Sequence, residues 1–371
     1  MNGKNSVQIR TLNGVQLFDN QRYISKDKKD GFSFLSEYSI NEVSERGYQS
    51  EGLMKFISYY SCKMSYQDVS ELVENKVSER VYSSCHIQHK IIALQKRVDL
   101  SIKKEYEGLQ LSFNFVDSQV DIYSPGSEEV LYFDDAIGVT KQKLKREDKM
   151  YVKDCKYVQT DNILLQNADK SYHYISFNKK EQVAEYIETQ IKQRLTLEYG
   201  TTMIPLVAIT DGASVIRERL HRMFGQSVKI ILDWYHLEKK IWNYFTRFGF
   251  SKIDKERHVE IVLKNLWHGC VIDALIYTEQ GMNVSNTKQY ILEELQNYIL
   301  KRQEEIIDYD TRYRIAKKTI GSGRGEKAND QTVADRQKHN GCSWSEKGSL
   351  ALASIKVIQL NKQWETFWKA A

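Results

Sequence analysis

The chain has 371 residues, a length that predicts about two or three domains. Hydrophobic residues make up 41% of the chain and charged residues 28%, which is ordinary for a soluble protein with a real core. Only two prolines occur, which excludes a Pro-rich or collagen-like architecture. The net charge of +5 is mildly basic and does not by itself establish a nucleic-acid partner.

The sequence shows no pattern that predicts a targeting signal or a disulfide framework. There is no run of ~18 apolar residues and no apolar stretch near the first residue, so we expect neither a transmembrane helix nor a signal peptide. The five cysteines lie far apart and form no Cys-x-x-Cys pair, which argues against a structural zinc site and a disulfide framework. We therefore expect a cytoplasmic protein with free thiols and no membrane partner.

The first 49 residues carry no clear pattern apart from a charged run at 26–30. Helical periodicity begins at Ser50 and predicts a helical region at 50–125. Ser65 and Ser83 stand where the N-caps of a second and a third helix are expected. The third helix is polar and basic, which is compatible with a helix-turn-helix module that contacts DNA through Lys90, Lys96 and Arg97. Three-helix segments also occur in proteins that bind no DNA.

The pattern changes to strands at Val130. We expect short strands at 130–133, 137–139, 157–165 and 172–177, a helix at 179–197, a buried strand at 203–209, a helix at 213–224 and a second buried strand at 228–232. The pattern of residues from Trp234 to about Tyr309 predicts helices. This stretch is too long for one connecting helix, so we interpret it as an all-helical insertion. A Gly-rich loop at 321–325 then leads into a last helical section.

This order predicts a ribonuclease-H-like α/β fold, in which a mixed sheet with an all-helical insertion follows a helical, helix-turn-helix-like N-terminal domain. The expected parts are a segment at 1–49, a DNA-binding region at 50–125, a first part of the catalytic core at 126–234, the insertion at 235–310 and a final part of the core at 311–371.

Acidic residues directly follow the expected buried strands. Asp134 and Asp135 follow the first strand, Asp211 follows the strand at 203–209, and Asp233 follows the strand at 228–232. Ligands and metals bind at the carboxyl ends of strands in open α/β sheets, and carboxylate oxygens suit Mg²⁺ or Mn²⁺. Any one of these aspartates could simply cap the following helix, but several of them in this strand order favour a metal site.

Other local patterns are weaker. The Asp233 and His236 pair could suggest zinc, although no third soft ligand is nearby. The loop at 321–325 lacks the spacing of a nucleotide-binding loop. Basic residues cluster from Lys141 to Lys156 and from Arg312 to Lys327, and such clusters are either solvated faces or nucleic-acid contacts.

Several separated motifs occur in a distinctive order. They are Thr-Asp-Gly-Ala at 210–213, Leu-Asp-Trp-Tyr-His-Leu at 232–237, Ile-Gly-Ser-Gly-Arg-Gly-Glu-Lys-Ala-Asn at 320–329, Arg-Gln-Lys at 336–338, Gly-Cys-Ser-Trp-Ser at 341–345, Gly348 and Trp364. With these motifs the chain resembles the bacterial insertion-sequence DDE transposases of the Mutator-like branch, over about residues 50–371. The zinc-binding cysteines of some relatives are absent here, which leaves DNA recognition to residues 50–105.

The resemblance implies that Asp134, Asp211 and Glu326 hold two Mg²⁺ or Mn²⁺ ions. Because Asp134 is followed by a second aspartate where glycine is commoner, Asp135 is the alternative first ligand. Asp233 and His236 are similar to an accessory motif, and we expect them to position the active site.

We assign the third carboxylate to Glu326 rather than Glu346. The glycines before Glu326 give the chain the φ freedom to turn into the cleft, and Glu326 would lie in the first turn of a helix. Arg324 and Lys327 flank it and could hold a DNA phosphate. Glu346 follows Ser345 and is more simply a first-turn residue of the terminal helix.

The function implied by the resemblance is a DNA transposase that cleaves a phosphodiester and transfers the freed strand to target DNA. Its partners would be double-stranded DNA, as element ends and target, and further copies of the chain in a homo-oligomer on DNA, where it would be nucleoid-associated. The alternatives are a catalytically silent or domesticated DNA-binding derivative and a ribonuclease-H-like nuclease without strand transfer.

Overall fold

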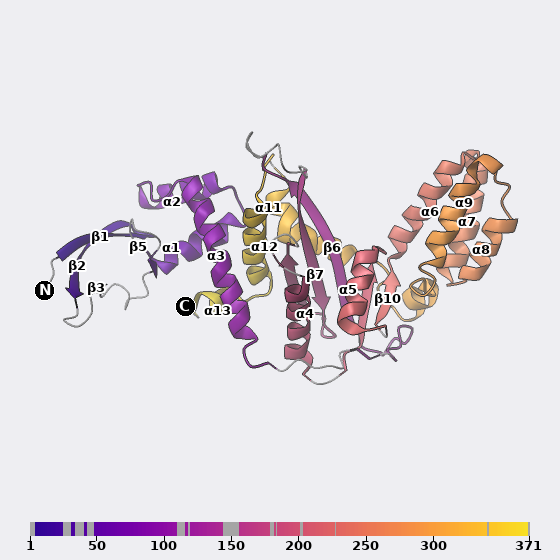
Figure 1. Ribbon diagram of the computed structural model, residues 1–371, viewed down its shortest axis with the longest axis horizontal. Coiled ribbons are helices and arrows are strands. Elements are labelled where there is room, and N and C mark those ends of the chain that lie inside the picture. The colour runs from indigo at the N-terminus through magenta and orange to yellow at the C-terminus, as the bar shows by residue number, and fades with distance from the viewer. Residues whose placement is uncertain are drawn as a thin grey trace.

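The computed structural model describes residues 4–24, 31–33, 41–42, 48–109, 116–117, 119–143, 156–178, 182, 184–200, 203–226, 228–339 and 341–369. Within these ranges the chain is elongated, with a small N-terminal sheet at one end, a larger sheet in the middle and a helical arm at the other end (Figure 1). The charged run at 26–30 and residues 144–155 of the basic cluster lie outside the described residues. None of the described helices is long and apolar enough to cross a membrane.

Strands of two to eleven residues occupy the N-terminal segment in which the sequence showed no clear pattern. They are β1 (Lys4–Thr11), β2 (Gly14–Ile24), β3 (Gly31–Ser33), β4 (Asn41–Glu42) and β5 (Tyr48–Gln49), arranged in the order β3-β2-β1-β5-β4. β1 and β2 form an antiparallel hairpin, whereas β1 and β5 pair in parallel across a long separation in sequence.

The helices expected after Ser50 are α1 (Glu51–Ser61), α2 (Tyr66–Val77) and α3 (Ser84–Glu105). Both expected caps are confirmed, because the hydroxyl of Ser65 accepts from the N–H of Asp68 at 3.0 Å and that of Ser83 accepts from the N–H of His86 at 3.4 Å. The apolar faces of these helices pack in one core with α12 (Glu346–Leu360) and α13 (Trp364–Lys369). The helical region at 50–105 therefore shares its core with the C-terminal end of the chain.

The central sheet contains β6 (Val130–Thr140), β7 (Tyr157–Gln166), β8 (Tyr172–Phe177), β9 (Leu206–Thr210) and β10 (Lys229–Leu232) in the order β10-β9-β6-β7-β8. β7 runs antiparallel to both β6 and β8, while β9 and β10 run parallel to β6. The two short strands expected at 130–133 and 137–139 form the single strand β6. Pro205 directly precedes β9, where its nitrogen does not interrupt the ladder.

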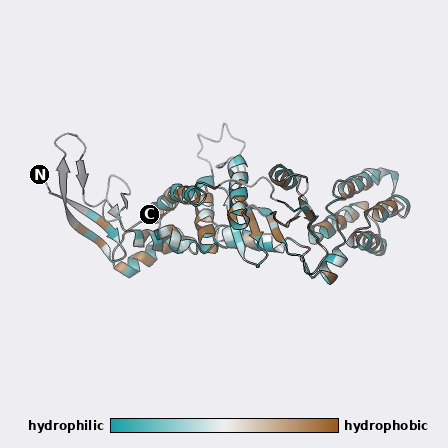
Figure 2. Cartoon of the chain, turned by 90° about the horizontal axis from the view of Figure 1, so that it is seen from below, coloured by the Kyte–Doolittle hydropathy of each residue, from teal (hydrophilic) through white to brown (hydrophobic). Residues whose placement is uncertain are grey.

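Both faces of the central sheet are covered, which makes this part of the chain a mixed α/β fold. α4 (Ala184–Tyr199) and α5 (Ser214–Phe224) pack on one face. The opposite face carries α10 (Gly323–Asn329), α12 and the root of the helical arm. Figure 2 shows hydrophobic residues on the central strands, as expected for strands buried from both sides.

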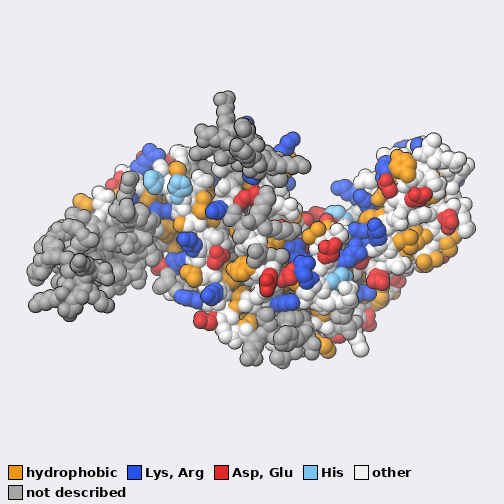
Figure 3. Space-filling view, in the orientation of Figure 1, with side chains coloured by type: hydrophobic (Ala, Val, Ile, Leu, Met, Phe, Trp, Pro, Cys, Tyr) orange, Lys and Arg blue, Asp and Glu red, His pale blue; other side chains and the backbone are white. Residues whose placement is uncertain are grey.

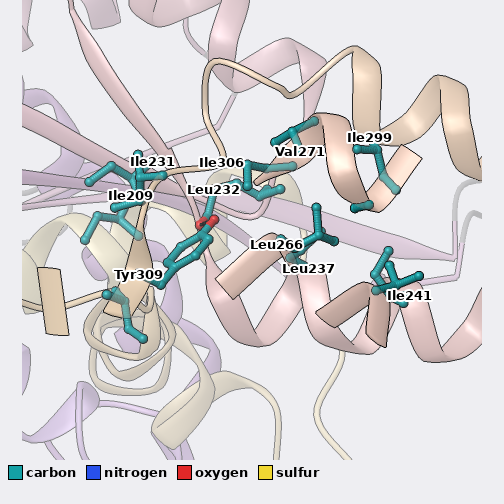
Figure 4. Packing of buried hydrophobic residues seen from close by; sticks show 14 of the residues in the cluster. Ile209, Ile231, Leu232, Leu237, Ile241, Leu266, Val271, Ile299, Ile306 and Tyr309 are labelled. Atoms are coloured by element: carbon teal, nitrogen blue, oxygen red, sulfur yellow. Dashed lines mark hydrogen bonds between the residues drawn. The ribbon is translucent and has the colours of Figure 1, made fainter. Parts of the chain in front are cut away.

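The stretch after β10 is helical, as the sequence predicted. It forms α6 (Trp234–Phe248), α7 (Lys252–Trp267), α8 (Val271–Gln280), the short η3 (Asn286–Lys288) and α9 (Gln289–Leu300). The buried side chain of Tyr309 lies at the root of this arm, where its hydroxyl donates to the carbonyl oxygen of Leu232 at 2.8 Å (Figure 4). Ile306 and Ile307 join the same core, so the arm and the edge strand β10 are packed together.

Two π-helical segments flank the return to the sheet, η4 (Thr311–Ile315) before α10 and η5 (Asp330–Ala334) after it, followed by α11 (Asp335–Gln337). α10 thereby lies against β6 and β7.

Candidate functional site

Strand register brings Asp135 and Asp211 to the same edge of the sheet. β6 and β9 are neighbouring parallel strands in which Phe133 is paired with Ile209. Asp135 and Asp211 each lie two positions further along, so they are level with each other. Phe133 and Ile209 share one hydrophobic core, and side chains two positions apart on a strand face the same side. Asp135 is half-buried and Asp211 is exposed.

Asp134 faces the opposite side of the sheet, so the geometry does not support it as the first ligand. Its Oδ2 accepts from the hydroxyl of Tyr132 at 3.0 Å and pairs with the guanidinium of Arg219 on α5 at 2.5 Å. Burial raises the pKa of Asp134 to about 6, although Arg219 and Tyr132 lower it. The structure separates Asp134 from the other expected ligands and leaves Asp135 in its place.

Glu326 lies in the first turn of α10, as expected, and its side chain is exposed. The reason expected for the preceding glycines is wrong, because none of Gly321, Gly323 and Gly325 has a positive φ. Gly325 instead allows close packing, since a Cβ added there would lie 3.1 Å from the Cβ of Phe133. The absence of a side chain thus lets α10 approach β6 and brings Glu326 to the edge occupied by Asp135.

Asn329 is a site residue that the sequence analysis missed. Its side-chain amide donates to Asp135 Oδ2 at 2.8 Å, and its carbonyl oxygen accepts from the amide of Asn162 on β7 at 2.6 Å. Asn329 lies three positions after Glu326, so both residues occupy one side of α10. The Glu-x-x-Asn spacing was the signal that could have identified it.

Asp233 holds the loop that leads into α10. It is the N-cap of α6, where it accepts from the N–H of His236 at 3.0 Å, and it also accepts from the Ser322 hydroxyl at 2.5 Å and from the Ser322 N–H. Burial alone would raise its pKa, but these donors prevail and lower the pKa of Asp233 to about 2. Asp233 therefore links the end of β10 to the start of α10. Ser322 was not among the expected site residues.

His236 is partly exposed, with its Nδ1 at 3.5 Å from Asp233 Oδ2. This contact raises the pKa of His236, against the effect of burial, and the negative charges of Asp211 and Glu326 act in the same direction. Asp233 is engaged with Ser322 and His236, which fits the expected positioning role.

The site carboxylates are electrostatically coupled. Burial raises the pKa of Asp135, and the negative charges of Asp211 and Glu326 raise it further, while His236 lowers it. Within the described ranges, no three His, Cys, Asp or Glu side chains lie close enough together to hold a metal ion. The carboxylates of Asp135, Asp211 and Glu326 are negatively charged oxygen donors, which a hard divalent cation prefers. Their oxygens do not converge on one point.

Arg302, which follows α9 in the helical arm, holds the turn that carries Asp211. Its guanidinium donates to the carbonyl oxygen of Gly212 and lies 4.7 Å from the ring centre of Tyr298. Gly212 has a φ of +82°, a conformation that favours glycine. This contact between distant segments was not visible in the sequence.

The basic cluster from Arg312 to Lys327 divides into structural and exposed residues. The fully buried Arg312 makes two bonds of 2.8 Å to the carboxylate of Glu129, and Lys318 pairs with the same carboxylate at 2.8 Å. Arg324 and Lys327 are exposed beside Glu326, as expected for residues that could meet a phosphate.

The expected DNA-binding residues of α3 also have different environments. Arg97 pairs with Glu51 at 3.0 Å and lies 4.4 Å from the ring centre of Trp368, so it is engaged in packing against α1 and α13. Lys90 lies 4.8 Å from the ring centre of Tyr82, and burial lowers its pKa to about 8. Lys96 is exposed.

Glu346 is a first-turn residue of α12, and Ser345 is the N-cap of this helix, as expected. The carboxylate of Glu346 accepts from the amide of Asn178 at 2.9 Å and lies 3.8 Å from Lys141 Nζ. These contacts join α12 to the ends of β6 and β8.

No family model matches the chain, and no curated protein matches it. The site must therefore be interpreted from its own chemistry. It brings Asp135, Asp211 and Glu326 to one edge of the sheet, with the exposed side chains of Arg324 and Lys327 beside Glu326.

Proposed function

We propose that the chain is a DDE-type DNA transposase that carries out metal-dependent phosphodiester cleavage and strand transfer with Asp135, Asp211 and Glu326. The observation that carries this proposal is the register of β6 and β9, which makes Asp135 level with Asp211 while α10 brings Glu326 to the same edge. The coupling that raises the pKa of Asp135 through the charges of Asp211 and Glu326 supports a shared site.

The topology supports a ribonuclease-H-like core. Three antiparallel strands are followed by two strands parallel to the first, with α4 before β9 and α5 before β10. The arm inserted after β10 and the return through α10 match the expected order of an interrupted catalytic core. We propose double-stranded DNA as substrate and target, and a homo-oligomer on DNA as the active form.

Carboxylate oxygens are suitable ligands for Mg²⁺ or Mn²⁺. Two bound ions would activate the attacking oxygen and stabilise the leaving oxygen of a phosphoryl transfer. A cation would also offset the repulsion among Asp135, Asp211 and Glu326. We assign supporting roles to the chain's own residues: Asn329 orients Asp135, and Asp233 positions the loop before α10.

The test is incubation of the full chain with DNA that carries the element's flanking ends and Mg²⁺ or Mn²⁺, with cleaved and joined products scored separately. We expect both products from the wild type, and neither from Asp135→Asn, Asp211→Asn or Glu326→Gln. Glu346→Gln is the matched control and should retain both reactions with at most a modest loss of stability. Mn²⁺ binding, measured by electron paramagnetic resonance, should weaken in the first three variants.

Each alternative gives a different result. Cleavage without joining would identify a nuclease, and DNA binding without either product would identify a silent derivative. The absence of both Mn²⁺ binding and products in the wild type would contradict the proposal.

A further inference from the structure

α6 exposes polar and aromatic side chains, four of which form one stripe along the helix. Leu237, Ile241 and Phe245 on one side of the helix are buried in the core of the arm. On the other side Tyr235, Lys239, Asn243 and Arg247 are exposed and follow one another at intervals of four residues. Residues four apart in a helix lie on the same face, so this stripe extends along α6 for about 18 Å at 1.5 Å per residue.

The stripe begins at the candidate active site. Tyr235 is 63% exposed, and its ring lies over the loop before α10, where a Cβ added at Gly321 would be 2.9 Å from the ring and 3.7 Å from Asp233 Oδ2. Tyr235 is therefore held beside Asp233 and the residues that lead to Glu326. Such an exposed ring at the opening of a site can stack on another flat ring.

The charge of the stripe favours a polyanion. It contains Lys239 and Arg247 and no acidic residue. Arg247 pairs with Glu294 at 2.6 Å, but both side chains are exposed, and pairs of this kind contribute little, so the guanidinium remains available to a phosphate. Figure 3 shows Lys and Arg side chains gathered on the side of the arm that borders the hollow next to the central sheet, and α6 forms this side of the arm in Figure 1.

We propose that the exposed stripe of α6 is a binding track for an unpaired DNA strand, with Tyr235 stacking on a base next to the reacting phosphate. This inference rests on the proposed function and deepens it by naming the form of DNA that the arm binds. A duplex hides the faces of its bases, so a stacking ring at this position selects unpaired nucleotides. Lys239 contacts the phosphates that follow along the helix.

The test uses the full chain without divalent metal and measures fluorescence anisotropy with two DNA probes, a blunt duplex and the same duplex with a short unpaired tail. The wild type should bind the tailed probe more tightly. Tyr235→Leu, which keeps an apolar side chain over Gly321, should lose roughly 5- to 100-fold in affinity for the tailed probe and little for the blunt one. Tyr235→Phe should behave as the wild type.

Two further variants serve as controls. One tests the contribution of charge to DNA binding, and the other tests whether loss of any exposed aromatic ring weakens binding. Lys239→Gln should reduce the dependence of binding on salt by about one phosphate contact. Tyr172→Ala removes a ring that is 44% exposed on the edge strand β8 and should leave both affinities unchanged.

Equal binding of both probes by the wild type, or unchanged tail preference in Tyr235→Leu, would overturn the inference and leave the proposed reaction intact. Failure of the proposed function would instead appear as a wild type that forms no cleaved and joined products, whichever of the two probes it binds.

Discussion

Asp134 and Asp135 are adjacent, but we expect their asparagine variants to differ. Asp134→Asn should lower stability and retain activity, whereas Asp135→Asn should retain stability and lose activity. The side chain of Asp134 is 1% exposed and that of its partner Arg219 is 6% exposed. Substitution of Asp134 removes the carboxylate that contacts the buried Arg219 guanidinium and leaves Asp161 as the other negative charge acting on it. Removal of one partner of a buried ion pair costs about 3–5 kcal/mol.

The neutral amide of asparagine can still accept from Tyr132, so we expect the lower end of this range for Asp134→Asn. A loss of ~3 kcal/mol lowers Tm by roughly 6–12 °C in a domain of about 150–250 residues. Asp135→Asn removes a charge that its neighbours repel, so its free energy of unfolding should change by less than about 0.5 kcal/mol. Cleavage, by contrast, should be lost only in Asp135→Asn.

The measurements are thermal unfolding by circular dichroism and DNA cleavage at a temperature well below both transitions. The double variant Asp134→Leu with Arg219→Met replaces the pair by apolar groups and should recover part of the lost Tm. A stable Asp134→Asn that cannot cleave, together with an active Asp135→Asn, would refute the assignment of Asp135 to the site.

Two further predictions concern single buried or partly buried charges. His236→Gln should remove a pH dependence of stability. Asp233 raises the pKa of His236 above 6.5, so the stabilising positive charge of His236 is fully present below pH 6.5 and is lost as the pH rises through the raised pKa. The Tm of the wild type should therefore fall over this pH range, and the Tm of the variant should not. Arg312→Met should lower the free energy of unfolding in urea by about 3–5 kcal/mol, because it leaves the buried Glu129 with Lys318 as its remaining described cation; an unchanged urea midpoint would contradict this interpretation.

The central elements could be predicted because their signals are local. The strand expected at 172–177 is β8, and Ser65 and Ser83 cap the helices that they were expected to cap. β4 and β5 at the N-terminal end of the chain were missed for the opposite reason. β4 and β5 are two residues long each, and β5 pairs with β1 across the sequence, so no local periodicity marks them.

Partners of charged residues could not be predicted from the sequence. Arg97 and Arg312 belong to basic stretches that resembled solvent-exposed or DNA-binding surfaces, yet their partners, Glu51 and Glu129, come from distant segments. The same limit applies to Arg302, which reaches the turn of Asp211 only because the arm folds back onto the sheet. The sequence shows which residues are charged, but only the folded structure shows which of them are paired within the protein and which are exposed.

The choice between Asp134 and Asp135 shows why the position of a candidate site residue on a strand is hard to predict from the sequence. Neighbouring residues on a strand point to opposite faces, so a shift of one residue moves a carboxylate from one face of the sheet to the other. On a strand with one exposed face the alternation of polar and apolar residues would resolve the choice. β6 is apolar on both faces from Val130 to Phe133 because helices cover the sheet on both sides, so its sequence carries no such alternation before the aspartates. The pairing of Phe133 with Ile209 and the position of Arg219 on α5 show that Asp135 lies level with Asp211, whereas Asp134 pairs with a buried guanidinium.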